Sequence, residues 1–259
     1  MKIGLCKLCK QEKELCNISH IIPNHAYNIL KEDDLFFLID KKNANKPSKQ
    51  KRYTGEFESS ILCKDCEMLI SNYETYGYRL IYRLDTLNIE NSITENENGL
   101  KALVIKGKGY DYSKFKLYLL SILWKASIST RPLFSEINLG KKTEEDLRNM
   151  ILAGNPGEVN EYPCGIILPA IFKKEGVECF PAENILFSGS PYKVEIDGSD
   201  IFIFLITGCT YMFPINYSGD KEHFSSVQKM QLIMPFLTEE KTTEERNKVI
   251  NQIRSWFID

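Results

Sequence analysis

Two pairs of cysteines are the residues of this chain best suited to chemistry, because each pair has the spacing Cys-x-x-Cys. Cys6 and Cys9 form the first pair, and Cys63 and Cys66 form the second. A Cys-x-x-Cys turn brings two sulfur atoms close enough to share one ion, and two such turns complete the tetrahedral ligand set of a structural zinc site. The two pairs therefore predict one Zn²⁺ held by four thiolates. The redox use of this spacing needs a thioredoxin-like βαβ context, which the sequence pattern does not show.

A second assignment of the zinc ligands stays open at the level of the sequence. Cys6, Cys9, Cys16 and His20 have the spacing Cys-x2-Cys-x6-Cys-x3-His, which also supplies four ligands. This assignment uses the histidine as a ligand and leaves the second Cys-x-x-Cys pair without a role.

A histidine lies between the two cysteine pairs, in the segment Ser19-His20-Ile21-Ile22-Pro23. Imidazole titrates near neutral pH, which suits a general base, although a histidine at the end of a strand can also be a core residue. Glu67 directly follows the second pair and offers a carboxylate to a metal ion, but the first turn of a helix favours Glu in any case. Glu74 falls on the same helical face as Glu67. His25 is a candidate second metal ligand, but it better suits a phosphate contact or a surface position.

The order of these motifs resembles the HNH, or ββα-metal, endonuclease family of treble-clef type over residues 3–75. Members carry structural zinc on two Cys-x-x-Cys pairs, an Asp-His-x-x-Pro segment between them, and a His after the second pair. The resemblance implies metal-dependent hydrolysis of phosphodiester bonds in DNA, with His20 as catalytic base and Glu67 as ligand of a catalytic Mg²⁺ or another divalent cation. Ser19 stands where the family has Asp, and Glu67 stands where it has His. In this chain the carboxylate of the expected site therefore follows the second cysteine pair, at Glu67, instead of preceding the histidine.

A cluster of basic residues lies between the histidine segment and the second cysteine pair. Residues 1–66 carry a small excess of Lys and Arg, whereas the whole chain has a net charge of −2. Such a cluster predicts a flexible arm that contacts the phosphates of nucleic acid, and the alternative is a solvated loop. The candidate nucleic-acid-binding residues are Lys41, Lys42, Lys46, Lys49, Lys51 and Arg52.

The composition is that of an ordinary soluble globular protein, with 259 residues, 43% hydrophobic and 26% charged. No apolar run approaches the roughly 18 residues that span a bilayer. The N-terminus lacks the apolar core of a signal peptide, so we expect a cytoplasmic protein that does not contact membranes. We expect Cys164, Cys179 and Cys209, which lie in apolar stretches, to be buried.

The elements that must position these residues predict an α+β protein. We expect an N-terminal zinc-bound treble-clef or ββα-metal module with a following helix over residues 1–90, and a larger region of mixed helix and antiparallel sheet over 91–259. The sequence predicts a loop over 40–58, a linker over 88–100, a strand over 102–105 and β-rich structure over 162–216 with a hairpin at Asp197-Gly198. Helices are predicted over 67–87, 114–127, 143–153 (from a capping box at Thr143) and 242–256.

Two functions follow from these expectations. The first is an HNH-like DNA endonuclease, whose second region recognises a target, binds a protein partner, forms a homo-oligomer or gates the nuclease, in bacterial defence against phage or mobile DNA. The alternative is a non-catalytic zinc-binding module that binds nucleic acid or a partner protein. Metal-dependent DNA cleavage that is lost in His20→Ala without loss of zinc separates the two functions.

Overall fold

The computed structural model describes the chain in ranges, which are residues 2–29, 31, 36–40, 48–83, 86–88, 90–95, 101–106, 110–158, 160–167, 170–173, 176–178, 190–196, 198–207, 209–216, 231–234 and 236–238. Helices and strands are mixed along the chain, which confirms the predicted α+β class. Contacts group the chain into two compact units. The first consists of Met1–Tyr78, Ser113–Gly157 and Gly189–Lys193, and the second of Arg79–Tyr112, Glu158–Ser188 and Val194–Asp259.

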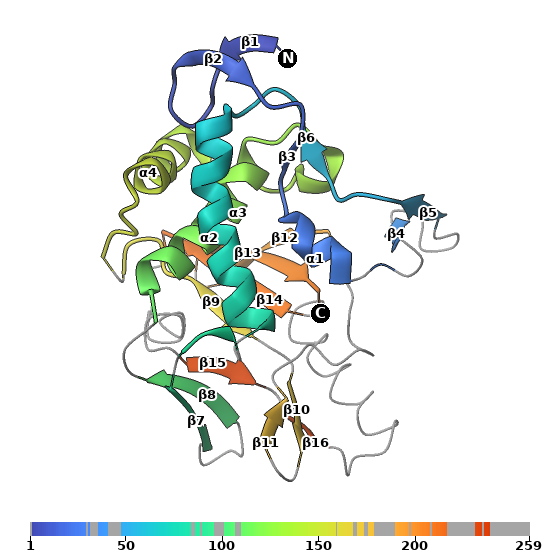
Figure 1. The fold of residues 1–259 in the computed structure, drawn as a ribbon, viewed down its shortest axis with the longest axis vertical. Helices are drawn as coiled ribbons and strands as arrows, with labels where there is room; N and C mark the ends of the chain where they lie inside the picture. The colour runs from blue at the N-terminus through green and yellow to red at the C-terminus, as the bar shows by residue number, and fades with distance from the viewer. Residues whose placement is uncertain are drawn as a thin grey trace. The chain divides into compact units, whose positions relative to one another are not determined.

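The first unit begins with a short antiparallel hairpin that carries the first cysteine pair. Its strands are β1 (Lys2–Leu5) and β2 (Glu12–Leu15), drawn in dark blue in Figure 1. The turn between them closes through hydrogen bonds from Cys6 N to Gln11 O and from Lys10 N to Cys6 O, both 2.9 Å long. Lys10 has a φ of 59°, a left-handed conformation that completes this tight turn.

The histidine segment forms a second small ladder in the first unit. β3 (Ser19–His20) pairs antiparallel with β6 (Phe57–Glu58), so that His20 lies opposite Phe57. α1 (Asn24–Ile29) follows β3 directly.

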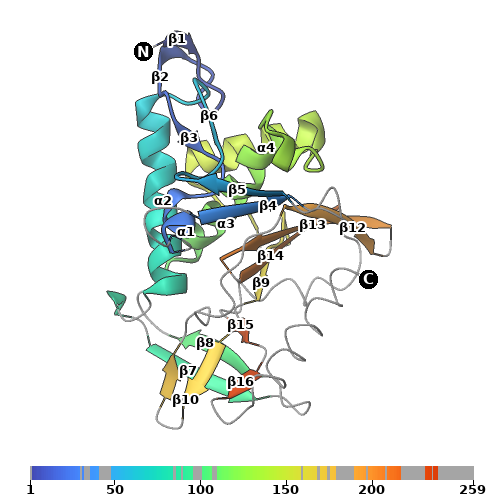
Figure 2. The same ribbon diagram turned by 90° about the vertical axis from the view of Figure 1, so that its right-hand side faces the viewer.

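The predicted loop over 40–58 is wrong in part, because strands lie within it. β4 (Phe36–Asp40) and β5 (Ser48–Arg52) form an antiparallel hairpin, which Figure 2 shows as a flat pair of arrows. A ladder of backbone hydrogen bonds forms whatever the polarity of the side chains, so a polar composition does not exclude a hairpin.

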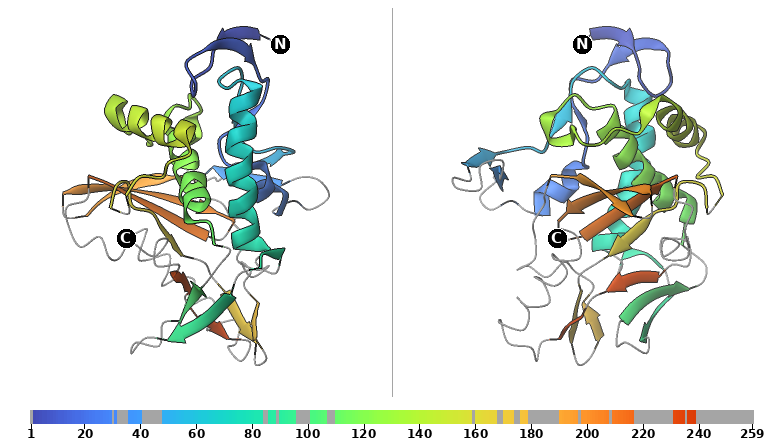
Figure 3. Two further views of the ribbon diagram at one scale, coloured as in Figure 1. Left: turned by 60° about the vertical axis from the view of Figure 1, so that its left-hand side comes forward. Right: turned by 180° about the vertical axis from the view of Figure 1, so that it is seen from behind.

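Three longer helices complete the first unit, and α2 and α3 lie side by side, as the left view of Figure 3 shows. α2 begins at Lys64 rather than at the predicted residue 67, which places Cys66 and Glu67 in its first turn. Among the described residues, no helix combines the length and apolar character that crossing a lipid bilayer requires. The helices are α2 (Lys64–Tyr82), α3 (Tyr112–Ser127) and α4 (Gly140–Ala153), with a 3-10 turn, η2 (Pro132–Phe134).

The close approach of α2 and α3 depends on a glycine. A Cβ atom on Gly77 would lie 2.4 Å from Cδ1 of Tyr118, so any other residue would push the helices apart. Every residue of α3 from Phe115 to Ala126 is buried, including Lys116 and Lys125. The predicted central buried helix is therefore confirmed, and it contains two buried lysines.

α4 begins earlier than its predicted capping box. Its N-cap is Leu139, without a side-chain cap, and Thr143 is a buried residue inside the helix. Neighbouring side chains satisfy the first backbone donors instead: Leu139 N donates to Ser127 Oγ (3.1 Å) and Gly140 N to Asn138 Oδ1 (3.0 Å). The helix ends at Gly154, in the left-handed conformation with φ 67°, as predicted.

The segment Ser113–Gly157 is bonded directly to the cysteine-bearing part of the first unit. Lys7 Nζ donates to Ile128 O (3.1 Å), and Arg148 Nη1 donates to Leu8 O (2.6 Å). The compact units therefore follow a different division from the predicted boundary at residue 90, since α3 and α4 group with the N-terminal segment.

The second unit is built on a seven-stranded, mostly antiparallel sheet of order β12-β13-β14-β9-β15-β8-β7, in which β15 and β9 are parallel. Four consecutive residues of β13, from Ile201 to Phe204, are buried, as expected for a strand covered on both faces. The strands of this sheet are β7 (Glu90–Glu95), β8 (Lys101–Lys106), β9 (Gly165–Ile167), β12 (Tyr192–Ile196), β13 (Ser199–Ile206), β14 (Cys209–Ile215) and β15 (Gln231–Met234). A three-stranded sheet contains β10 (Ala170–Lys173), β11 (Gly176–Glu178) and β16 (Phe236–Thr238).

Most predicted elements of the second unit are confirmed. The hairpin at Gly198 joins β12 and β13, and β8 covers the strand predicted over 102–105. The predicted linker over 88–100 is wrong in part, because β7 within it pairs antiparallel with β8. Cys164 and Cys209 are buried as expected. Cys179 and the helix predicted over 242–256 lie outside the described residues.

Candidate metal centre and adjoining site

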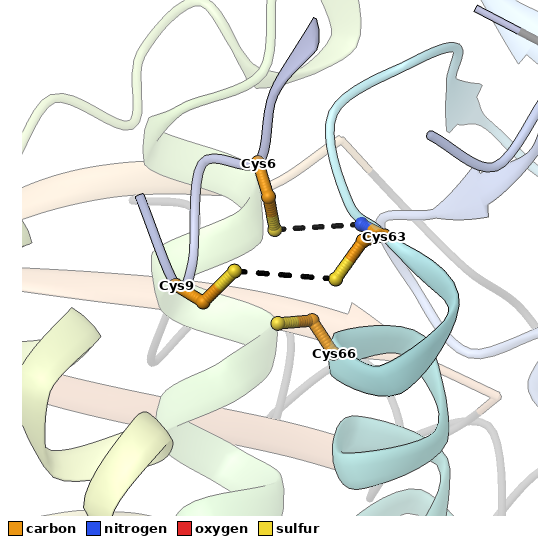
Figure 4. Close-up of side chains that lie close together, drawn as sticks. All are labelled: Cys6, Cys9, Cys63 and Cys66. Carbon is orange, nitrogen blue, oxygen red and sulfur yellow. Dashed lines mark hydrogen bonds between the residues drawn. The ribbon is translucent and has the colours of Figure 1, made fainter. Parts of the chain in front are cut away.

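Four cysteine side chains converge at one point of the first unit. The sulfur atoms of Cys6, Cys9, Cys63 and Cys66 all lie within 4.8 Å of one another, and Cys9 Sγ is 4.0 Å from Cys63 Sγ. Figure 4 shows that the first pair reaches from the β1–β2 turn toward the second pair at the start of α2. Zn–S bonds of about 2.3 Å in a tetrahedron require sulfur atoms about 3.8 Å apart, so these four fit a Zn²⁺ ion.

The peptide backbone holds the two cysteine pairs together. Lys7 N donates to Ile61 O and Cys16 N donates to Leu62 O, both at 2.8 Å, and Cys63 forms a bridge with Leu15. Cys63 N also donates to Cys6 Sγ at 3.4 Å. Amides that point at a sulfur favour its thiolate form, the form that binds zinc.

The pKa shifts of the cysteine thiols are also consistent with a cation bound among them. Burial raises the pKa of Cys6, but hydrogen bonds at Cys9, Cys63 and Leu8 outweigh it and leave the pKa lowered. Burial, together with the other sulfurs of the cluster, raises the pKa of Cys66. Buried thiolates repel one another, and a Zn²⁺ ion would compensate their charge.

The rival ligand set of the sequence analysis is not the one that the fold assembles. Cys16 and His20 lie outside the group of four sulfurs. Nε2 of His20 instead lies 2.9 Å from Thr54 Oγ1, and its ring meets Phe57 edge to face with centroids 6.1 Å apart. The imidazole is thus not used by the candidate zinc site.

His20 is half-buried at the end of β3, and two lysines lie near enough to influence its ionisation. Burial is the main cause that lowers the pKa of its imidazole, and Lys125 and Lys31 lower it further. The ring is therefore neutral at neutral pH, which is the state that can accept a proton.

Glu67 and Ser19 form a polar pair beside the sulfur cluster. Ser19 is fully buried, and neither Ser19 Oγ nor Glu67 Oε1 has a partner at normal hydrogen-bond geometry among the described residues. Burial raises the pKa of the Glu67 carboxyl and the Glu74 carboxylate adds to the rise, whereas Ser19 and Lys125 oppose it. The hydroxyl of Ser19 is thus the polar neighbour of this buried carboxyl.

A buried lysine from α3 completes this polar cluster. Lys125 is 2% exposed, and its ammonium donates to Glu74 Oε1 at 2.6 Å and to the main-chain oxygen of His20 at 2.6 Å. Glu74 is therefore part of an ion pair. We call Ser19, His20, Glu67, Glu74 and Lys125 the polar cluster.

The predicted basic arm is described only in part. Lys49, Lys51 and Arg52 lie on β5, and the side chains of Lys51 and Arg52 are exposed. Tyr53, which follows the strand, is 69% exposed, and the next residue, Thr54, contacts His20. Lys41, Lys42 and Lys46 lie outside the described residues.

The expectation of a phosphate-contacting or surface position for His25 is wrong. Its ring packs against Tyr78, with centroids 4.8 Å apart, and lies 6.4 Å from that of Tyr118. Burial lowers the pKa of His25 to about 4. The residue is a neutral, half-buried ring packed against tyrosines, because α1 turns its side chain toward the helices.

Lys125 is the residue of the polar cluster that the sequence analysis missed. Its signal was present in the sequence, since Lys116 and Lys125 interrupt a helix that is otherwise strongly apolar. Lysine is almost never fully buried unless it is paired. A charged residue in the middle of an apolar helix therefore predicts a buried partner, although it does not identify that partner.

The first unit thus contains a four-sulfur group suited to zinc and a separate polar cluster that includes His20. The function is inferred from these two groups and from the basic strand that leads to them. Comparison with protein-family models, with curated proteins and with solved structures gave no match to this chain.

Proposed function

We propose that this chain is an HNH-like nuclease that hydrolyses phosphodiester bonds in DNA, with His20 as the general base. The observation that carries the proposal is the position of His20: its imidazole lies at the end of β3, in contact with Thr54 and Phe57, and outside the group of four sulfurs. Zn²⁺ on the four cysteines then stabilises the fold and leaves the histidine available for chemistry.

The surroundings of His20 suit the transfer of a proton from water. Contact between Nε2 and Thr54 Oγ1 fixes the orientation of the ring, and in the tautomer in which Nε2 donates, Nδ1 is the nitrogen that accepts the proton. Ser19 Oγ and Glu67 Oε1 are buried side-chain oxygens of the same unit without a partner at normal hydrogen-bond geometry among the described residues, and we propose that they bind the attacking water. Water held beside a neutral imidazole is the arrangement that general-base hydrolysis needs.

The basic strand supports nucleic acid as the substrate. β5 carries Lys49, Lys51 and Arg52, and the chain passes from there through exposed Tyr53 to Thr54 at the histidine. Basic side chains neutralise phosphates, and an exposed aromatic ring can stack on a base. The same short segment would thus hold a strand of DNA next to His20.

A divalent cation at the position that the family resemblance gives it does not fit the residues present. Ser19 offers a neutral hydroxyl, Glu67 one carboxylate, and the Glu74 carboxylate is already paired with an ammonium. Mg²⁺ prefers carboxylate, phosphate and water oxygens in octahedral geometry and is repelled by a neighbouring positive charge. The proposed hydrolysis therefore uses no such ion.

The proposal is tested by incubating the purified chain with supercoiled plasmid, in buffers with and without Mg²⁺ or Mn²⁺. We expect cleavage by the wild type and loss of about 100-fold or more in rate in His20→Ala, since general-base catalysis contributes about 10² to 10⁴. Zinc content should be the same in both proteins. Thr75→Ala, an exposed change on α2, serves as the control and should cleave like the wild type.

The alternative is a non-catalytic module that binds nucleic acid or a partner protein through the zinc-bearing unit. Ser19 in place of the family's Asp and the ion pair of Lys125 with Glu74 favour it. A binding module should retain DNA in a gel-shift assay, cleave it under no condition and be indifferent to His20→Ala. For the nuclease, the presence of a second unit suits target recognition in bacterial defence against phage or mobile DNA.

A further inference from the structure

We propose that the outer edge of β1 is a docking site for a partner protein, which adds an extended segment of apolar and basic residues as a further strand. The inference does not depend on the proposed nuclease, because it concerns the cysteine-bearing hairpin and not the histidine. It starts from Ile3 and Leu5, two large apolar residues of β1 whose exposed fractions are 70% and 61%.

The direction of the backbone groups of β1 follows from the hydrogen bonds of the hairpin. Cys6 N donates to Gln11 O at 2.9 Å, so the N–H group of Cys6 faces the chain of β2. In an antiparallel pair this direction alternates from residue to residue, and the backbone groups of Gly4 therefore also face β2. The N–H and C=O groups of Ile3 and Leu5 point the opposite way, toward the outer edge of β1.

This outer edge is open within the part of the chain that the structure describes. There, β1 pairs with β2 alone, and no other described segment makes a hydrogen bond to the backbone of Ile3 or Leu5. β2 does use its far edge, where Cys16 N donates to Leu62 O at 2.8 Å. In Figure 1, β1 is accordingly the outer strand of the hairpin. Unpaired N–H and C=O groups along a strand are a template for the strand of another protein.

One face of the hairpin is apolar on β1 and acidic on β2. The register places Ile3 opposite Glu14 and Leu5 opposite Glu12, so these four side chains share a face. Both glutamates are exposed, and neither forms an ion pair with another described residue. This face therefore presents apolar surface beside two carboxylates that lack a counter-ion in the described part of the chain.

The opposite face of the hairpin is turned toward the rest of the first unit. Leu15 on that face is 3% exposed, and Lys13 Nζ donates to Asp65 Oδ2, at the start of α2, at 2.9 Å. The apolar and acidic face is thus the one that stays accessible to a partner.

The two carboxylates determine the chemistry of the occupant. An added strand would lie about 5 Å from β1 and about 10 Å from β2, a distance over which Lys or Arg reaches a glutamate while its stem covers Ile3 or Leu5. The carboxylates would repel the phosphates of nucleic acid. A second copy of the hairpin would bring the same apolar and acidic side chains and leave the charges uncompensated. Charge complementarity therefore favours an extended protein segment that alternates apolar and basic residues.

The experiment uses the full chain, expressed with zinc, and a fluorescent synthetic peptide in which Thr alternates with Val and Arg. We expect the peptide to bind, as measured by fluorescence anisotropy. A peptide with Glu in place of Arg should bind about tenfold more weakly or less, because its charges repel those of β2. A peptide N-methylated on the edge that faces β1 should not bind, because it lacks the donors that pair with the backbone.

Variants of the chain test the same contacts from the other side. Glu12→Lys with Glu14→Lys should exchange the preference, so that the Glu peptide binds better than the Arg peptide. Glu136→Lys, an exposed charge reversal elsewhere in the first unit, is the matched control and should bind like the wild type. Leu5→Pro removes one outward N–H without removing a bond to β2, and should abolish binding while zinc content stays the same.

Three outcomes would overturn the proposal: no binding of the Arg peptide to the zinc-loaded wild type, equal binding of the Arg and Glu peptides, or equal binding of the N-methylated peptide. If sedimentation shows a dimer that Leu5→Pro dissociates, the occupant is a second copy and the partner segment is excluded. Should Leu5→Pro lose its zinc, the N-methylated peptide still tests the backbone contacts. None of these measurements involves DNA cleavage, so their failure leaves the nuclease untouched.

Discussion

At the scale of single residues, the surroundings of His20 disfavour the charged form of its imidazole. Lys125 reaches it from α3 and Lys31 from the end of α1, while Thr54 and Phe57 contact the ring from the segment around β6. Burial and the two lysines all disfavour the imidazolium ion. The neutral ring is therefore retained to lower pH than in an exposed histidine, whose pKa is about 6.5.

The first prediction concerns the pH dependence of DNA cleavage. A general base works only when it is neutral, so the acid limb of kcat/KM should fall at a pH below about 6.5. Lys31→Met removes one of the two positive charges and should shift that limb toward higher pH. Rates measured from pH 4.5 to 8 on plasmid DNA test both expectations. An acid limb at or above pH 6.5 in the wild type would contradict them.

Spacing along the sequence predicted the cysteine ligands and the histidine between them, because each motif is local. Lys125 could not be placed in the same way, since 105 positions separate it from His20. Its role depends on how α3 packs against α2, which no local pattern specifies. The same reason explains His25, whose side chain enters a core of tyrosines from distant helices.

At the scale of elements, β6 is bonded to the segment after α3 by one carboxylate. Glu58 Oε1 accepts hydrogen bonds from Thr130 N (2.6 Å), Thr130 Oγ1 (2.9 Å) and Ser129 Oγ (2.9 Å). Burial opposes ionisation of this group, but these donors and Arg131 outweigh it and lower its pKa. The interaction holds β6, the strand that pairs with His20, against the segment that follows α3.

The second prediction follows from this carboxylate. Glu58→Gln removes its charge and should lower the free energy of unfolding by about 1.5 to 3 kcal/mol at pH 7, the range for hydrogen bonds to charged groups. Because the pKa is lowered on folding, the contribution is complete above the unfolded pKa of about 4.3 and is lost as the pH falls through the folded pKa. In urea unfolding, the difference in the free energy of unfolding between Glu58→Gln and the wild type should be smaller at pH 3.5 than at pH 7.

Glu12→Gln, on the exposed face of β2, is the control and should change the free energy of unfolding by less than about 0.5 kcal/mol. A Glu58→Gln protein as stable as the wild type at pH 7 would show that β6 is held by other contacts.

Among the elements, the helices were the most predictable, because α3 and α4 have clear apolar periodicity. The polar strands β5 and β7 were predicted as loop and linker, since their residues lack that signal. Their pairing partners, β4 and β8, provide the ladder that makes them strands. Pairing is a property of two segments, so the composition of one alone cannot reveal it.

At the scale of the whole molecule, the first unit is assembled from separated parts of the chain. Residues 1–78 supply the cysteines and His20, whereas Ser113–Gly157 supplies Lys125, the partners of Glu58, and Arg148. The sequence motifs end before residue 90, so they predict a domain boundary there. They carry no information on hydrogen bonds between residues on opposite sides of that boundary.

The third prediction concerns a fragment of residues 1–90. It lacks the partners Ile128, Thr130 and Arg148, and its apolar surface toward α3 would be uncovered. With zinc supplied, we expect it to be digested by protease much faster than the same residues in the full chain. Limited proteolysis followed by mass spectrometry measures this. Equal resistance of residues 1–78 in the two proteins would mean that the zinc-bearing part folds alone.

The distance along the chain between His20 and Lys125 has a consequence for synthesis on the ribosome. Translation proceeds at about 5 to 20 residues per second, so Lys125 is made about 5 to 20 seconds after His20. All four cysteines are made well before it and can take up their ion first. Until Lys125 is made, the carboxylate of Glu74 and the main-chain oxygen of His20 lack the ammonium that both contact in the finished protein.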